Sequence, residues 1–420
     1  MAVRRLAAVD AQTYWMSAKI PNDQFLLYGF DGLPANLDQA IDVIRGRASE
    51  CAELRLRVRD GSVLTYPAWV SDEVDVAQFT VHELDDNSWA GCLAAVSRLA
   101  DDQLDPRVRP WRLHVFTPVD GIPTTTGAGT VAVLQIAHVL ADGGRTSALA
   151  ALLFGRAGDV PPVTSPRLRG VTLPWRSFTA VRAHRQLVRD TEAGLVPEQA
   201  QSRPALRTNA RPAGARSVRT VVRRRGQLPG PTVTIGVLCA LSTALSAHLR
   251  ELGDDPSTLG AEVPMAKATV REAHNHFGNV GVGLYPGLEP EERAVRIADD
   301  MACRRRRAEH PAMRADSRAF AAVPAPLLRW GVAQFDPTRR WPTVTGNTVV
   351  SSVNRGPADL RFADATVAVT AGYPALSPMM GLTHGVHGIG DTVAISVHAA
   401  ESAIGDIDAY VARLDAALDG

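Results

Sequence analysis

The sequence predicts an α/β protein of two lobes, each built from mixed strands and helices flanking a sheet. Strand-like and helix-like hydrophobic patterns alternate in both halves, which favours a layered α/β architecture. Nine prolines fall between residues 161 and 231 and indicate a crossover. With 420 residues, 45% of them hydrophobic, the chain is long enough for two cores. We therefore expect an N-terminal lobe over 1–155, a linker over 156–231 and a C-terminal lobe over 232–420.

The first half contains strand and helix signals in turn. Asp10 is placed to cap a first helix. Period-two alternation predicts a hairpin across Asp60-Gly61. The strands expected here are 25–30, 54–58, 63–70, 109–116 and 131–136, and the helices are about 15 residues from Leu37, 89–103 and 146–154.

The linker is expected to hold one helix near 178–192, and the second half again mixes both element types. Its strongest helix is 232–252, where leucines recur at helical spacing and Gly253 is a plausible stop. Arg304 to Arg307 end another helix, where cations complement the helix dipole. The other expected strands are 259–265, 281–285, 348–353, 365–372, 379–386 and 392–398, and the other helices are 290–309, 319–335 and 404–418.

Charge and cysteine usage limit the classes of function. The net charge of +1 argues against nucleic-acid binding, but residues 155–231 hold 15 arginines against four acidic residues, or +11. That segment could meet phosphates, an acidic protein or anionic lipid. Four widely spaced cysteines favour a reducing cytoplasm over disulfides or zinc. We expect a cytoplasmic protein without a transmembrane helix, with peripheral membrane contact left open.

His138 is the leading candidate for a catalytic residue. A β-rich apolar run delivers it to an Asp142-Gly143-Gly144 turn that precedes a helix-like segment. A neutral imidazole near pH 7 can take a proton from a hydroxyl or amine and return it to a leaving group. The chemistry alone leaves an alternative, in which His138 is a core histidine and Asp142 only caps the helix.

The segment Ala137-His138-Val-Leu-Ala-Asp142-Gly143 resembles the His-His-x-x-x-Asp-Gly motif of chloramphenicol acetyltransferase-like enzymes and condensation domains. Within that superfamily the chain resembles the wax ester synthase/diacylglycerol acyltransferase family. Further resemblances follow in order along the chain: Val9-Asp10-Ala11 with Ile20-Pro21, Arg109-Pro110-Trp111-Arg112-Leu113-His114, Gly278-Asn279 before Leu284-Tyr285-Pro286, and Ser351-Ser352-Val353-Asn354-Arg355-Gly356-Pro357.

The resemblance implies two chloramphenicol acetyltransferase-like lobes with an active-site tunnel between them and His138 at its middle. It implies that His138 deprotonates an acceptor hydroxyl, which attacks the thioester of acyl-coenzyme A. Asp142 then holds the loop through an arginine and relays no proton, and no cofactor is needed. The residues expected at the substrate are Gly143, Asn279, Ser351, Ser352 and Asn354.

Several of these residues have a structural alternative, and the motifs depart from the family. Gly278-Asn279 could be a β-turn, and the serines with Asn354 could simply end a strand. The first motif histidine is Ala137, while Ser352 and Asn354 replace an asparagine and a proline. Histidines at 274, 276, 384 and 387 lack a carboxylate or cysteine at ligand spacing, so no metal site is predicted.

Three functions remain open from the sequence. The first is transfer of an acyl group from acyl-coenzyme A to an alcohol, giving a wax ester, a triacylglycerol or a specialised-metabolite ester. The second is transfer to an amine, or from an acyl carrier protein docked on the +11 segment. The third is an inactive relative that binds an acyl chain or a protein, which Ala137 motivates.

Overall fold

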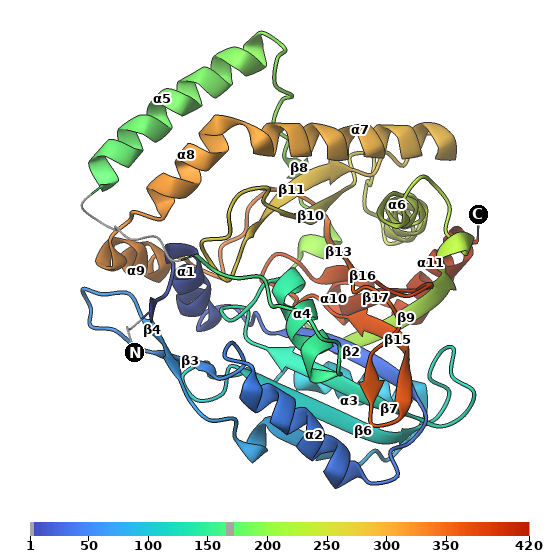
Figure 1. Ribbon diagram of the computed structural model, residues 1–420. Coiled ribbons are helices and arrows are strands. Elements are labelled where there is room, and N and C mark those ends of the chain that lie inside the picture. Colours follow the sequence, from blue (N-terminus) through green and yellow to red (C-terminus); the bar gives the residue numbers. More distant parts are fainter. Residues whose placement is uncertain (1–3, 165–171, 420) are drawn as a thin grey trace.

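The computed structural model describes residues 4–164 and 172–419 and contains two six-stranded mixed sheets with flanking helices (Figure 1). The helices are α1 (Ala8–Ser17), α2 (Leu37–Glu50), α3 (Trp89–Leu99), α4 (Gly143–Leu153), α5 (Leu173–Glu192), α6 (Val233–Glu251), α7 (Pro290–Glu309), α8 (Pro311–Phe320), α9 (Ala325–Ala333), α10 (Glu401–Ile404) and α11 (Ile407–Leu418). The strands are β1 (Arg4–Arg5), β2 (Gln24–Asp31), β3 (Leu56–Arg59), β4 (Ala68–Ser71), β5 (Phe79–His82), β6 (Trp111–Val119), β7 (Gly129–Ile136), β8 (Arg203–Pro204), β9 (Arg216–Arg224), β10 (Gly260–Ala266), β11 (Phe277–Gly283), β12 (Thr343–Val344), β13 (Thr348–Asn354), β14 (Arg361–Phe362), β15 (Ala365–Gly372), β16 (Leu382–Ile389) and β17 (Thr392–Ala400).

The N-terminal sheet has the order β14-β15-β2-β7-β6-β5, with only the β5–β6 pair parallel. Its centre, β2 and β7, is almost entirely buried because both faces are covered. One face packs against α2 and α4, where Tyr28 and Phe30 both contact Phe154. The other face packs against α3 and part of the second sheet. As predicted, β3 and β4 pair antiparallel.

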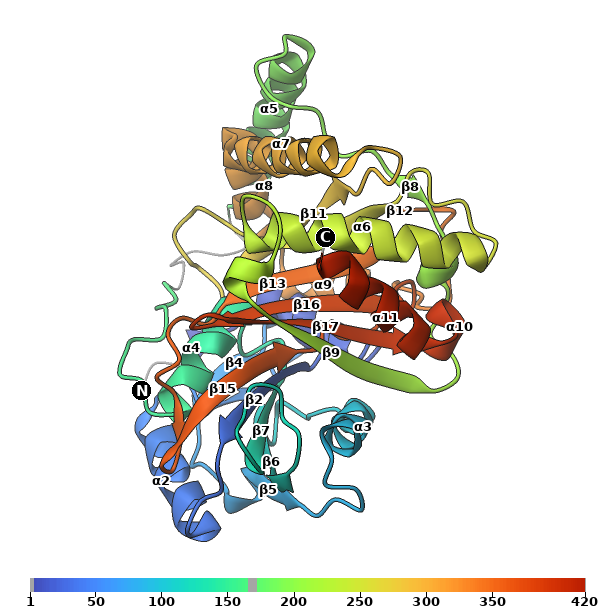
Figure 2. The same ribbon diagram turned by 90° about the vertical axis from the view of Figure 1, so that its right-hand side faces the viewer.

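The C-terminal sheet has the order β11-β10-β13-β16-β17-β9, and its inner pairs β10–β13 and β13–β16 are parallel. Helices α6, α7 and α11 cover one face and complete a second core (Figure 2). Helix α6 is long and apolar enough to cross a membrane by length and composition, but 67% of that stretch is buried inside the protein. It is the central core helix of this lobe.

Two strands do not belong to the sheets that the expected boundaries at residues 155 and 231 would assign them to. β15 lies in the predicted C-terminal lobe yet pairs with β2 of the N-terminal sheet. β9 lies in the predicted linker yet pairs along its whole length with β17. The N-terminal sheet therefore takes a strand from the C-terminal part of the chain, the C-terminal sheet takes one from the expected linker, and the proposed boundaries do not separate the two sheets.

Other local expectations need correction. Asp10 does not cap α1, because Ala7 is the N-cap and Asp10 lies buried within the first turn. Two of the arginines near the end of α7 also bind backbone carbonyls, in addition to any interaction with the helix dipole: Arg304 donates to Glu198 O, and Arg307 donates to Pro197 O at 2.8 Å. Helix α5 starts five residues earlier than expected, at Leu173, because Pro174 fits the first helical turn.

Candidate functional site

His138 lies in the loop between the end of β7 and the start of α4. The loop leaves the middle of the N-terminal sheet, because β2 and β6 flank β7 on both sides as antiparallel partners. Its first residue, Ala137, is buried and donates its backbone amide to Pro110 O at 2.9 Å. The strand register thus delivers the histidine to the edge that faces the second lobe.

The His138 ring stacks on Phe277, the first residue of β11, with centroids 5.5 Å apart and an interplanar angle of 22°. The residue is partly exposed, but its Nδ1 is buried and has no hydrogen-bond partner among the described residues. Burial lowers the pKa of His138, against the opposing effects of its own backbone, Asn275 and Asp142. The imidazole is therefore neutral near pH 7 and able to accept a proton.

Asp142 is fully engaged by groups other than His138. Its carboxylate accepts the Arg145 backbone amide at 3.1 Å, which caps α4. It also accepts the His276 amide at 2.9 Å and pairs with Arg271 at 2.7 Å. These donors hold the pKa of Asp142 below its usual range although burial opposes them. Asp142 therefore fastens the loop to residues 271–276 of the C-terminal lobe, and Arg271 is its arginine.

Asp10 and Asn275 form a second fastening that the sequence did not reveal. Asp10 accepts the backbone amides of His274 and Asn275, both at 2.9 Å. The Asn275 amide Nδ2 donates to Asp10 at 3.1 Å and to the backbone carbonyl of His138 at 2.8 Å. Burial raises the pKa of Asp10 to about 6. From the sequence, Asp10 was interpreted as a helix cap and as part of the Val9-Asp10-Ala11 resemblance, and neither interpretation indicated a contact with Asn275.

His274 holds the same loop from another side. It bonds Leu140 O at 2.6 Å through Nδ1 and Arg4 at 2.7 Å through Nε2. Because the guanidinium can only donate, Nε2 is the acceptor and Nδ1 carries the proton. The ring stacks on Trp69, and burial with nearby arginines keeps its pKa well below the ordinary value. His274 is therefore a neutral structural residue.

The predicted substrate-binding residues fall into two groups. Gly143 starts α4 without a positive φ, and a Cβ there would lie 3.6 Å from Val353, so tight backbone geometry does not explain it. Ser351, Ser352 and Asn354 share β13 with Val353. Ser352 bonds Thr234 at 2.8 Å and Asn354 accepts the Gly356 amide at 3.0 Å. The end of β13 therefore lies beside the start of α4.

Asn279 lies farther along β11 and is not in a turn. It is exposed, and its side chain donates to Glu262 on the neighbouring β10. Within the described part of the chain no hydrogen bond or ring contact joins it to His138, so its substrate role stays a prediction. Among residues 4–164 and 172–419, no three histidine, cysteine or acidic side chains form a group that could hold a metal ion.

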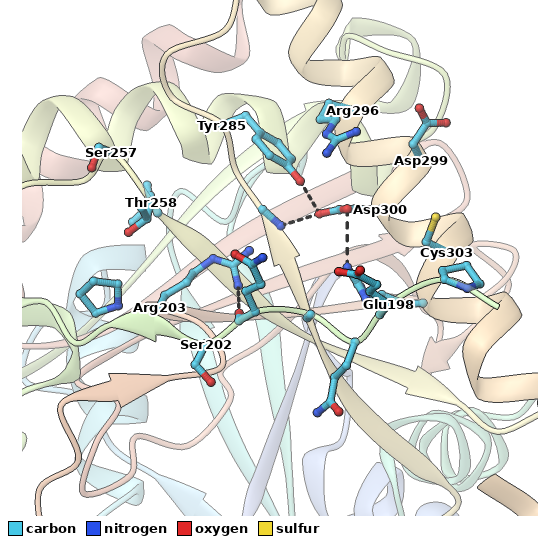
Figure 3. A pocket seen from close by; sticks show the side chains of 18 residues that line it. Glu198, Ser202, Arg203, Ser257, Thr258, Tyr285, Arg296, Asp299, Asp300 and Cys303 are labelled. Carbon is cyan, nitrogen blue, oxygen red and sulfur yellow. Dashed lines mark hydrogen bonds and ion pairs between the residues drawn. The ribbon is translucent and has the colours of Figure 1, made fainter. Parts of the chain in front are cut away.

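A separate pocket of about 520 Å³ lies between residues 197–204 and the C-terminal lobe (Figure 3). Its wall is braced by Asp300, which accepts from the Tyr285 hydroxyl at 2.7 Å and the Gly283 amide at 3.0 Å. Charged residues of both signs line it: Arg203, Arg296, Arg304, Glu198, Asp299 and Asp300. None of the predicted site residues lines this pocket, and it adjoins the end of β11 away from Phe277.

One segment of the chain matches a known protein family. Residues 274–420 match the family described as WS/DGAT C-terminal domain. The match covers 147 of the 420 residues, so this segment resembles the C-terminal domain of the wax ester synthase/diacylglycerol acyltransferase (WS/DGAT) family. The matched segment begins at His274, within the group of residues that fastens the His138 loop, and the family is one of acyltransferases. No curated protein matches the chain.

Solved structures share the fold over the whole chain. The wax ester synthase/diacylglycerol acyltransferase from Marinobacter aquaeolei VT8 is 17% identical, with a TM-score of 0.64 over 99% of this chain and 98% of that one. The starter condensation domain of rhizomide synthetase, solved with C8-CoA and Leu-SNAC, is 13% identical, with a TM-score of 0.59 over 99% and 93%. The chain thus has the predicted two-lobed α/β fold.

Proposed function

We propose that this protein transfers an acyl group from an acyl-coenzyme A thioester to an alcohol, with His138 as general base. The observation that carries the proposal is a neutral, partly exposed imidazole whose loop is fastened across the lobes by Asn275 and Asp142. Such fixation keeps a base at one position relative to a substrate bound between the lobes.

The proposed reaction uses Nε2, since Nδ1 is buried. His138 takes the acceptor hydroxyl proton while that oxygen bonds to the thioester carbonyl carbon. The tetrahedral intermediate then collapses, the carbon–sulfur bond breaks, and the imidazolium returns the proton to the leaving thiolate. The products are an ester and free coenzyme A. The carboxylate of Asp142 takes no proton in this scheme, because Arg271 and two backbone amides occupy it.

Coenzyme A release tests the proposal most simply. Purified protein is mixed with acyl-coenzyme A donors of different length, with and without a long-chain alcohol or diacylglycerol. Free thiol and ester product are then measured. We expect thiol release that requires the acceptor and matches the ester formed. The proposal fails if no donor and acceptor pair gives acceptor-dependent thiol release.

Two alternative functions are each favoured by a specific observation. An amine acceptor, or a donor on an acyl carrier protein, fits the condensation-domain neighbours and the 15 arginines between residues 155 and 231. Faster release from a carrier-bound acyl group, lost at high salt, would favour it. A non-catalytic binder fits Ala137, and thermal stabilisation by acyl-coenzyme A without turnover would favour that reading.

A further inference from the structure

Helix α5 stands at the edge of the C-terminal lobe, outside both sheets, and packs on α8 along one side (Figures 1 and 2). Ala180 and Leu187 are its buried residues. Polar contacts fix both ends. Arg176 donates to Arg318 O at 3.1 Å, and Asp190 bonds His310 at 3.1 Å. The helix is therefore held in one orientation, and its outer side has a defined direction.

That outer side carries large apolar side chains. Trp175 is 72% exposed, Phe178 64%, Val181 51% and Val188 43%. At 3.6 residues per turn, Trp175, Phe178 and Val181 lie on the side away from Ala180 and Leu187. Two aromatic rings within one turn of an exposed helix are unusual for a surface that meets only water.

Arginines share this outer side. Arg182 and Arg185 are exposed and make no hydrogen bond or ion pair with the described residues, while Arg189 contacts only Gln186, at 2.6 Å. Of the two acidic residues on α5, Asp190 bonds Gln186 and His310, while Glu192 is exposed at the C-terminal end of the helix. Arg182, Arg185 and Arg189 therefore outnumber the one exposed carboxylate of the helix and leave a net positive charge beside the exposed aromatic rings.

We propose that α5 docks the protein on an anionic lipid surface through Trp175, Phe178 and Val181, flanked by Arg182, Arg185 and Arg189. We call these six residues the α5 membrane face. Aromatic side chains favour the interface between acyl chains and headgroups, and basic side chains attract anionic headgroups. A second copy of the chain fits this face less well, because the arginine rows would repel each other. The proposal does not depend on the acyl transfer proposed above.

Vesicle sedimentation tests the proposal with the full chain. Phosphatidylcholine vesicles with and without phosphatidylglycerol are mixed with wild-type protein, and the bound fraction is measured over a salt series. We expect binding to the phosphatidylglycerol vesicles that weakens as salt rises. Trp175→Ser with Phe178→Ser should lower the partition coefficient at least tenfold. Arg182→Gln with Arg185→Gln should lower it about 25-fold, or roughly fivefold for each charge.

Matched controls change equivalent groups elsewhere. Trp341 is 51% exposed outside α5, and Arg59 and Arg98 are exposed on the N-terminal lobe. Trp341→Ser and the pair Arg59→Gln, Arg98→Gln should keep wild-type binding, and thermal melts should show all variants folded. The proposal is overturned if wild-type protein ignores anionic vesicles or if the controls lose as much binding as the α5 variants. A concentration-dependent dimer in light scattering that Trp175→Ser with Phe178→Ser abolishes would instead assign the face to a second copy.

Discussion

Asn275 offers the sharpest test of how the catalytic loop is held. In Asn275→Ala the backbone amide still bonds Asp10, but the His138 carbonyl loses its 2.8 Å donor. A buried acceptor left without a partner costs about 1–3 kcal/mol of unfolding free energy. A shift of the imidazole by about 1 Å would lower the rate of proton transfer by about 100-fold. We therefore expect kcat to fall about 10- to 100-fold while KM changes little.

The assay is acceptor-dependent thiol release over a range of acyl-coenzyme A concentrations, together with a denaturant melt. Asn87→Ala is the matched control, because Asn87 is exposed on a loop of the N-terminal lobe and its side chain makes no hydrogen bond with the described residues. It should change neither kcat nor stability by more than about 0.5 kcal/mol. If Asn275→Ala raises KM and leaves kcat intact, Asn275 contacts substrate and does not position the base.

Three further predictions follow from charged groups near the site. Because Asp142 and Arg271 form an ion pair at low exposure, each of Asp142→Asn and Arg271→Met should lower the unfolding free energy by about 3–5 kcal/mol. The double variant should lose less than the sum of the two single losses, and additive losses in denaturant melts would refute the coupling. Burial lowers the pKa of His138, so the acid limb of kcat/KM should lie below pH 6.5, and a midpoint above that value would contradict a buried base. Asp10 has a pKa of about 6 when folded against 3.8, so its proton is favoured in the folded state, and its contribution to stability falls by about 2 kcal/mol as pH rises from 4 to 6. Asp10→Asn should flatten that part of the stability profile, and an unchanged profile would show that another group titrates there.

The sequence predicted most individual elements because their hydrophobic periods are strong. α7 matches its expected bounds, and α6 differs by one residue at each end. It failed for β9, whose Arg216 to Arg224 run was taken for a linker. There Arg219 and Arg223 are partly buried and pair with Asp408 and Asp415 on α11. Four arginines among these nine residues hid a strand whose valines Val218 and Val221 are buried.

Long-range pairing lay beyond the sequence. No local sequence pattern indicates that β15 pairs with β2 in the N-terminal sheet, because the two strands are more than 300 residues apart. For the same reason the sequence could predict that His138 lies on a loop after a strand, but it could not predict which residues hold that loop in place. Asn275 and Arg271 come from the other lobe, and only the packing of the two lobes brings them to His138 and Asp142.

The most direct test of the central claim is the rate of thiol release by His138→Ala at saturating acyl-coenzyme A and acceptor. Loss of a general base should lower kcat by about 100- to 10,000-fold while the protein keeps its melting temperature and its affinity for acyl-coenzyme A. His184→Ala, an exposed histidine on α5, should keep the wild-type rate. A His138→Ala variant that releases thiol as fast as wild type would contradict His138 as the base.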